Sequence, residues 1–126
     1  MDVIGAFLNG EFEDGERVYI EVPQGFEKYY DPVTEVLLLG KTLYGLKQSA
    51  KQFWRALLMC FKSMNVLKSK VDPCLYYKWE PKGLVIWLSW VDDCLVVGPK
   101  PAVMRARDEF MARFDCNDLG EVTEYV

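Results

Sequence analysis

Two adjacent carboxylates, Asp92 and Asp93, interrupt an apolar run that extends from Leu84 to Gly98. The run is rich in strand-forming residues, and its pattern predicts two buried strands joined by a tight turn with both acids at the tip. Carboxylates held rigidly on a hairpin can bind the Mg²⁺ ions that phosphoryl transfer requires. Aspartate also favours turns without any catalytic role, so this hairpin alone leaves ordinary turn chemistry open as the alternative.

The absence of histidine narrows the chemistry further. It removes the commonest general base and the usual Ser-His and Cys-His nucleophile systems. The four cysteines form no Cys-x-x-Cys pair, and their wide spacing favours buried, reduced thiols over a zinc site. Carboxylates, lysines and metal ions remain, and two-metal phosphoryl transfer uses that set. The cysteines are Cys60, Cys74, Cys94 and Cys116.

A mixture of strands and helices is expected to position these residues. Periodicity and turn signals along the chain indicate an α+β fold in which two helices cross the strands. The expected elements, in chain order, are strands at 2–8, 18–22 and 36–39, a helix from Ser49 to about 65, strands at 75–79, 84–90 and 94–97, and a helix from Pro101 to about 114.

The first of these helices has the clearest pattern. Ser49 followed by Gln52 has the form of a capping box, with Ser49 as the N-cap. The apolar residues behind it recur at helical spacing, so the helix is amphipathic and its aromatic side chains are expected in the core. These apolar residues are Ala50, Phe53, Trp54, Leu57, Leu58, Phe61 and Met64.

Length and charge bound the organisation of the chain. Its 126 residues, 51% of them hydrophobic, can bury one core, which indicates one domain or a piece of one. The net charge of −4 is unevenly distributed, because residues 41–70 hold seven basic side chains and no acidic one. This basic block can form a local face that tracks phosphates. A solvated helix face with nothing bound explains it equally well, and charge alone leaves both open.

No targeting or membrane-spanning segment is recognisable. The apolar stretches fall short of the roughly 20 residues that a bilayer-spanning helix needs. The N-terminus shows no basic region followed by an apolar core, so a secretory signal is not expected. We therefore expect an intracellular location, in a cytoplasmic particle or the nucleus, with no membrane partner.

Three blocks in a fixed order carry a family resemblance. They are Asp2–Gly10, Lys41–Ser49 and the Trp90–Asp93 segment, which resemble motifs A, B and C of a copia-type (Pseudoviridae-like) LTR retrotransposon reverse transcriptase. The connecting segments 18–26, 72–76 and 114–121 are similar to those of the same family. The resemblance covers almost the whole chain, and the three motifs together are highly specific.

The resemblance implies a partial polymerase palm, with an antiparallel sheet, an Asp-Asp hairpin and two packed helices. Asp2 and Asp92 resemble the two carboxylates that bridge the metal ions, with Asp93 beside them and the Val3 carbonyl as an additional ligand. Two Mg²⁺ ions, or Mn²⁺ in their place, would stabilise the attacking 3′-oxygen and the departing pyrophosphate. A non-catalytic alternative for Asp2 is an exposed chain terminus.

Other motif residues correspond to the nucleotide site of the family. Phe7 resembles the aromatic residue under the sugar of the incoming nucleotide, which excludes a ribose 2′-OH; its alternative is a core phenylalanine on a strand. Tyr44 and Gly45 resemble a nucleotide-binding turn, where glycine permits close backbone approach. Lys47 corresponds to a phosphate contact, and a surface lysine is its alternative.

By the same resemblance, residues 1–126 form a single partial reverse transcriptase domain, a palm without the N-terminal part of the fingers and without the thumb. Its implied partners are an RNA or DNA template-primer and dNTPs, and its oligomeric state is not indicated. A chain truncated in this way is expected to be inactive alone.

Three hypotheses therefore remain: an RNA-directed DNA polymerase palm, an inactive retrotransposon remnant that at most binds nucleic acid, and an unrelated palm-like phosphotransferase such as a nucleotide cyclase.

Overall fold

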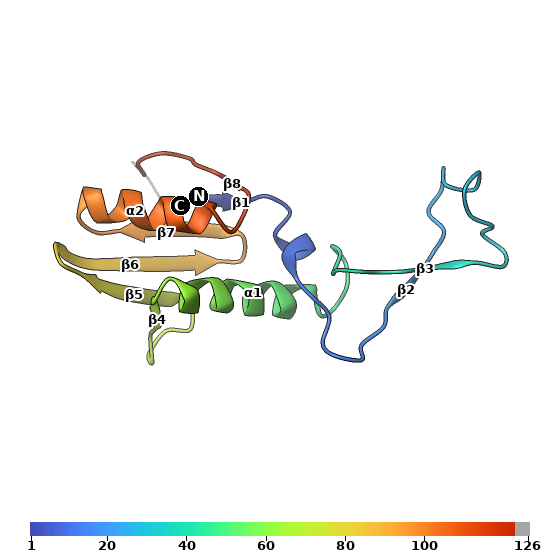
Figure 1. Ribbon diagram of the computed structural model, residues 1–126, viewed down its shortest axis with the longest axis horizontal. Coiled ribbons are helices and arrows are strands. Elements are labelled where there is room, and N and C mark those ends of the chain that lie inside the picture. Colours follow the sequence, from blue (N-terminus) through green and yellow to red (C-terminus); the bar gives the residue numbers. More distant parts are fainter. Residues whose placement is uncertain (123–126) are drawn as a thin grey trace.

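A six-stranded antiparallel sheet covered by two helices forms the body of the molecule, and a two-stranded ribbon extends away from it (Figure 1). The computed structural model describes residues 1–122. Its elements are β1 (Asp2–Val3), the 3₁₀ helix η1 (Ala6–Asn9), β2 (Tyr19–Glu21), β3 (Val36–Leu38), α1 (Ser49–Ser63), β4 (Leu67–Lys68), β5 (Leu75–Glu80), β6 (Gly83–Trp90), β7 (Asp93–Val97), α2 (Lys100–Met111) and β8 (Cys116–Asn117).

The strands of the large sheet lie in the order β4-β5-β6-β7-β1-β8, and every neighbouring pair is antiparallel. Short turns join β5 to β6 and β6 to β7, whereas β1 enters the sheet between β7 and β8 from the other end of the sequence. The expectation of a mixed α and β fold with an antiparallel sheet and two helices is confirmed.

Both helices pack on the same face of this sheet. Along β6 the buried residues alternate, because successive side chains of a strand point to opposite faces. Phe61 of α1 joins the layers: its ring centroid lies 4.4 Å from that of Tyr76 on β5, 5.3 Å from Trp87 on β6 and 5.9 Å from Phe110 on α2. The core therefore lies between the helices and one sheet face, and no helix within residues 1–122 covers the other face.

The first helix is amphipathic as expected, but its start differs. Gln48 is the N-cap and makes no side-chain capping bond. Ser49 is already helical, and its hydroxyl donates to the carbonyl of Leu43. The expected capping box is therefore wrong, because Ser49 is buried and ties the preceding loop to α1. The helix ends at Ser63, and Asn65 follows in the left-handed conformation at φ 57°.

The expected strand over residues 2–8 is mostly wrong. Only Asp2 and Val3 pair in the sheet, and η1 begins at Ala6. Gly5 adopts the left-handed conformation, with φ 58°, and this turn breaks the extended backbone. The apolar residues that follow pack against α1 from η1 rather than from a strand.

Two burial predictions also need correction. The helical pattern predicts Trp54 in the core, but this residue lies at the flank of α1 beside Lys68 of β4 and is 41% exposed. Three of the four cysteines are buried, whereas Cys74 lies in the turn before β5 and is only partly buried. An apolar position in a helix, or a cysteine, is buried only where another element covers it, and neither the helical pattern nor the cysteine spacing shows whether one does.

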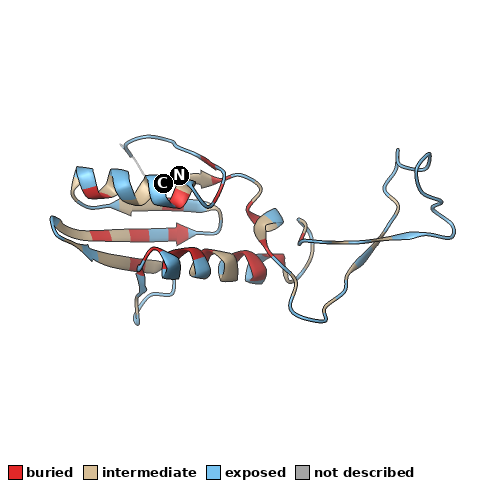
Figure 2. Ribbon diagram, viewed as in Figure 1, coloured by how far each residue is buried: buried red, intermediate tan, exposed pale blue. Residues whose placement is uncertain are grey.

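The ribbon, here called the arm (residues 11–41), has no core of its own. Its strands β2 and β3 pair with Ile20 opposite Leu37, and none of its residues is buried (Figure 2). Side chains at its base connect it to α1: Glu13 contacts Lys51 at 3.0 Å and Arg55 at 2.6 Å. Among residues 1–122, no helix combines the length and apolarity needed to cross a membrane.

Candidate functional site

Asp2 and Asp93, far apart in the sequence, lie directly opposite each other on β1 and β7. Met1 and Cys94 exchange two 2.8 Å hydrogen bonds on one side of this pair, and the Val3 N–H donates to the Asp92 carbonyl at 2.9 Å on the other. Asp2 and Asp93 therefore form a non-hydrogen-bonded pair, for which Cα atoms lie about 4.5 Å apart and the side chains share a face.

That shared face is the one that the helices leave open. Cys94 follows Asp93 and is buried on the helix side, so the alternation of strand side chains directs Asp93 to the opposite side. Burial raises the pKa of the Cys94 thiol to about 12 and that of Cys116 to about 11. The thiols behind the carboxylates thus stay protonated and uncharged.

The turn between β6 and β7 consists of Val91 and Asp92, with Trp90 paired to Asp93. Val91 is left-handed at φ 55°, as the first residue of a two-residue hairpin turn requires. A β-branched residue rarely takes this conformation, which costs on the order of 1–2 kcal/mol. The turn sets Asp92 beside Val3, one position beyond the facing pair of carboxylates.

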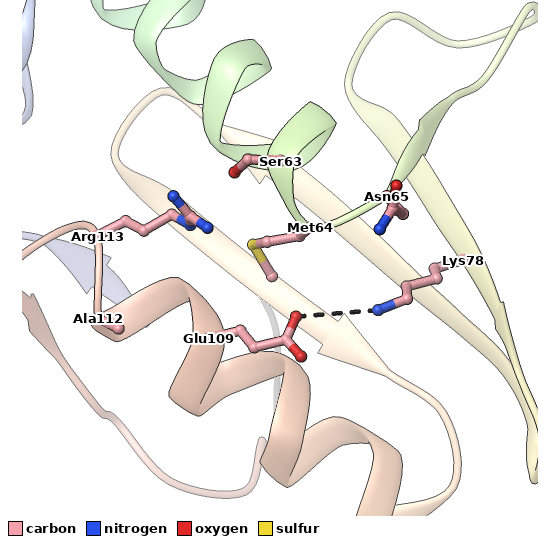
Figure 3. Close-up of a pocket in the computed structure, with 7 residues that line it drawn as sticks. All are labelled: Ser63, Met64, Asn65, Lys78, Glu109, Ala112 and Arg113. Carbon is pink, nitrogen blue, oxygen red and sulfur yellow. Dashed lines mark ion pairs between the residues drawn. The ribbon is translucent and has the colours of Figure 1, made fainter.

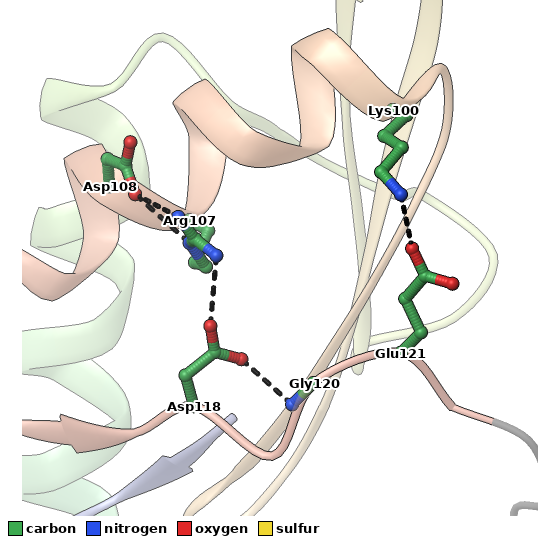
Figure 4. A network of polar contacts seen from close by, with 6 residues as sticks. All are labelled: Lys100, Arg107, Asp108, Asp118, Gly120 and Glu121. Atoms are coloured by element: carbon green, nitrogen blue, oxygen red, sulfur yellow. Dashed lines mark hydrogen bonds and ion pairs between the residues drawn. The ribbon is translucent and has the colours of Figure 1, made fainter.

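The edge strand β8 supplies a further polar group. Asn117 pairs with Asp2 across the sheet, and its side-chain N–H donates to Asp2 Oδ2 at 3.3 Å. Ion pairs to α2 hold the segment after β8, with Arg107 3.0 Å from Asp118 and Lys100 2.6 Å from Glu121 (Figure 4). Sequence reasoning missed Asn117 because only the pairing of β8 with β1 brings it to Asp2.

The candidate metal ligands at this site are all oxygen atoms, which are the ligands that a hard divalent cation prefers. Within residues 1–122, no three acidic, cysteine or histidine side chains gather closely enough to hold a metal ion alone. A facing pair of carboxylates nevertheless fits Mg²⁺, which proteins commonly bind through one or two carboxylates together with substrate phosphates and water.

Phe7 and Tyr44 form a second cluster. Their ring centroids lie 4.9 Å apart, and Phe7 also lies 6.4 Å from Phe53 of α1. Phe7 sits on η1 and is partly buried, whereas Tyr44 is exposed. Thr42, fully buried, links the two segments: its hydroxyl donates to the Phe7 carbonyl and its N–H donates to the Gly10 carbonyl at 3.1 Å. Sequence reasoning overlooked Thr42, although it lies in the same block as Tyr44.

The loop before α1 carries the remaining predicted residues. Gly45 is left-handed at φ 91°, and a Cβ added there would meet no atom within 4 Å. Lys47 is exposed and makes no ion pair with any of the described residues. Figure 1 places η1, this loop and the β6–β7 turn at the end of the body from which the arm leaves. The structure therefore places Asp2 opposite Asp93, with Asp92 in the adjoining turn, and Phe7 beside Tyr44, while Lys47 is exposed.

A cavity of about 490 Å³ lies elsewhere, between the C-terminal ends of α1 and α2 and strand β5 (Figure 3). Lys78 reaches Glu109 across it at 3.9 Å, and Arg113 lies on its opposite side. None of the predicted site residues lines this cavity. The candidate site is thus an open sheet face rather than an enclosed pocket.

Comparison with known proteins identifies the family. Residues 1–126 match the family described as "Reverse transcriptase (RNA-dependent DNA polymerase)". The chain is 38% identical over 122 residues to the retrovirus-related Pol polyprotein from transposon TNT 1-94 of Nicotiana tabacum, covering 95% of this chain and 9% of the polyprotein. It is 32% identical over 123 residues to the Pol polyprotein from transposon RE1 of Arabidopsis thaliana, covering 97% of this chain and 8% of that protein.

The chain thus spans less than a tenth of the length of these curated relatives. No solved structure gives a significant match. The resemblance to copia-type elements that the three motifs indicated is confirmed by these relatives. The chain belongs to the reverse transcriptase (RNA-dependent DNA polymerase) family.

Proposed function

We propose that this chain is the palm of an RNA-directed DNA polymerase, which adds deoxynucleotides to the 3′ end of a primer under the direction of a template. Its partners in this role are an RNA or DNA template-primer and dNTPs. The family match and the similarity to transposon Pol polyproteins support the class of reaction. The geometry of the sheet supports the choice of the residues proposed to perform it.

One observation carries the proposal: Asp2 and Asp93 face each other across β1 and β7, with Asp92 in the adjoining turn. No local sequence rule brings these carboxylates together. Like charges placed directly opposite in a sheet repel and destabilise the pair. This repulsion lowers the stability of the fold, and a bound cation would offset the loss.

Asp2, Asp92, Asp93 and the Val3 carbonyl are the proposed metal ligands. Two bound Mg²⁺ ions, or Mn²⁺, would polarise the reacting phosphate and stabilise the entering and leaving oxygens. The chain itself presents the carboxylates on an exposed sheet face, where a triphosphate can complete the coordination. Asn117 holds one oxygen of Asp2 and so orients the other.

The cluster around Phe7 is the proposed nucleotide pocket. The buried Thr42 fixes the backbone of Phe7 and the loop that carries Tyr44 and Gly45 relative to each other. The Phe7 ring would then exclude a 2′-OH by contact, and the open backbone at Gly45 would allow close approach of the substrate. Lys47, exposed beside it, would contact a phosphate.

Primer extension tests the proposal. The chain is assayed with a primed RNA template, dNTPs and Mg²⁺. Any extension that it supports should depend on these carboxylates, so Asp2→Asn or Asp93→Asn should lower its rate by about 100-fold or more, since even residues that only orient metal ligands contribute about 10- to 100-fold. Asp14→Asn, an exposed aspartate in the arm, is the matched control and should extend like the wild type. A folded sample without any extension would exclude polymerase activity for this chain.

A second measurement keeps metal binding separate from turnover. Mn²⁺ should broaden the NMR signals of Asp93 and Asn117 before those of α1, and Asp93→Asn should abolish the effect. Broadening without extension would favour an inactive remnant with an intact metal site. Turnover of a nucleoside triphosphate without primer or template would instead favour a palm-like phosphotransferase such as a nucleotide cyclase.

A further inference from the structure

The solvent side of α1 carries a charged surface that the proposed polymerase site does not use. Lys51, Arg55 and Lys62 follow the spacing i, i+4, i+11, which places them along one side of the helix. That side is opposite to the one that packs on the sheet, so the three cations point into solvent. Between residues 41 and 70 the sequence contains no acidic side chain.

A partly exposed aromatic ring flanks this surface on the side of β4. Trp54 is 41% exposed, and the Lys68 ammonium group lies 4.7 Å from its ring centroid. Lys68 reaches it from β4, an edge strand of the large sheet. A tryptophan at an apolar position of the helical pattern is thus partly exposed next to a lysine, and its exposed part can stack on a flat apolar group.

The charges of this surface are compensated only in part. Glu13 of the arm lies within 3.0 Å of Lys51 and 2.6 Å of Arg55, which neutralises the N-terminal half of the helix face. Lys62 and Lys68 have no carboxylate within ion-pair distance anywhere in residues 1–122. A polyanion would therefore be attracted to the part of the face near Lys62, Lys68 and Trp54.

One flat ring beside two uncompensated lysines favours a nucleic acid over an acidic peptide. Single-strand binders combine a basic track along the phosphates with aromatic side chains on which bases stack. The distance from Lys51 to Lys62 along the helix is about 16 Å at 1.5 Å per residue, enough for a few nucleotides. An acidic peptide would use the lysines but would leave Trp54 without a stacking partner.

We propose that the outer face of α1 and its flank beside β4, with Trp54, Lys62 and Lys68 as the principal contacts, form a second binding surface for single-stranded nucleic acid. It lies on the helix side of the sheet, whereas Asp2 and Asp93 lie on the open side. A strand bound there is held away from the carboxylates. The surface therefore retains template or product strand near the protein and takes no part in the chemical step.

The test is equilibrium binding of a fluorescently labelled single-stranded RNA of about 20 nucleotides, measured by anisotropy in EDTA without dNTPs. Because metal and nucleotide are absent, the result is independent of polymerase activity. Lys62→Gln combined with Lys68→Gln should weaken binding at least tenfold and reduce the salt dependence by about 0.7 per lost phosphate contact. Trp54→Ala should weaken it about tenfold.

Matched variants locate the effect. Lys28→Gln combined with Lys82→Gln removes two exposed lysines elsewhere, and Trp79→Ala removes an exposed tryptophan at the far end of β5. Both should bind like the wild type, and circular dichroism verifies that every variant is folded. Equal losses in the α1 variants and these controls would overturn the proposal, as would wild-type affinity in the α1 variants. Polyglutamate that competes as well as RNA would overturn it in favour of an acidic protein partner.

Discussion

The body and the arm are built from similar residues but reach opposite states of burial. Strands β5, β6 and β7 lie between neighbouring strands and under two helices, and Tyr76 and Trp87 are fully buried. Strands β2 and β3 contain strand-forming residues of the same kinds, yet every residue from 11 to 41 is exposed or only partly buried (Figure 2). The body and the arm therefore have similar strand propensity, but only in the body do the strands pack against other elements and form a core.

The difference also separates the residues with candidate functions from the rest. The three aspartates, Phe7 and Tyr44 all belong to the body or to its junction with the arm. A two-stranded ribbon is marginal in water without further packing, so the arm cannot hold a side chain to the tolerance that catalysis needs. The body can, because its register is fixed by a buried face.

The largest expected difference between the two regions is in the free energy of unfolding that is lost when an aromatic side chain is truncated to alanine. Phe61→Ala removes the ring that joins both helices to the sheet, and it should lower the free energy of unfolding by about 3–5 kcal/mol. Tyr29→Ala in the arm, where the ring is 66% exposed, should change it by less than about 0.5 kcal/mol. Urea titration measures both, and Phe61→Leu serves if the alanine variant does not fold. Equal effects would mean that the arm is covered in solution.

Amide hydrogen exchange should show the next largest contrast. Amides in the ladder between β5 and β6 should exchange at least about a hundredfold more slowly than those between β2 and β3. The reason is that the arm can open without exposing any core. Exchange measured residue by residue by NMR checks this, and matched protection in the two ladders would contradict it.

A smaller effect is expected at the strained turn of the body. Val91→Gly should stabilise the chain by up to about 1 kcal/mol. Glycine removes a left-handed strain of about 1–2 kcal/mol, and the larger conformational entropy that it loses on folding offsets about 0.5–1 kcal/mol of this gain. Asn65→Gly is the control: Asn65 is also left-handed, but asparagine tolerates that conformation, so the gain should be close to zero. Thermal unfolding distinguishes them, and destabilisation by Val91→Gly would show that the turn is not strained.

The smallest effect concerns the ion pairs that join arm and body. Lys51, and then Arg55, lower the pKa of Glu13 from its ordinary value of 4.5. A lowered carboxyl pKa means that the contribution of these ion pairs is present above the ordinary value and is lost as the pH falls through the lowered one. NMR titration of the Glu13 carboxyl carbon should show the lowered midpoint, and Lys51→Gln should move it back up. An unchanged midpoint in this variant would show that Lys51 does not contact Glu13 in solution.

Local sequence patterns correctly predicted those elements whose apolar side is covered by a neighbouring element. The helical spacing around Phe53, Leu57 and Phe61 gave α1, and the alternation in 84–90 gave β6, because in both cases the apolar side is the side that becomes buried. The same patterns failed at Gly5 and Trp54. A left-handed glycine interrupts a run that looks extended, and an apolar position on a helix stays exposed if no element covers it.

The sequence by itself determined the family of this protein, through three motifs in a fixed order, and it showed a chain without histidine that has one basic block. Only the tertiary structure decided which carboxylate faces Asp2, because the register of β1 against β7 depends on two segments at opposite ends of the chain. It also decided that Asn117 contacts Asp2 and that Thr42 joins Phe7 to the loop of Tyr44. The periodicity of a sequence predicts individual helices and strands. These contacts arise from pairing between elements that are distant in the sequence, which no local pattern predicts.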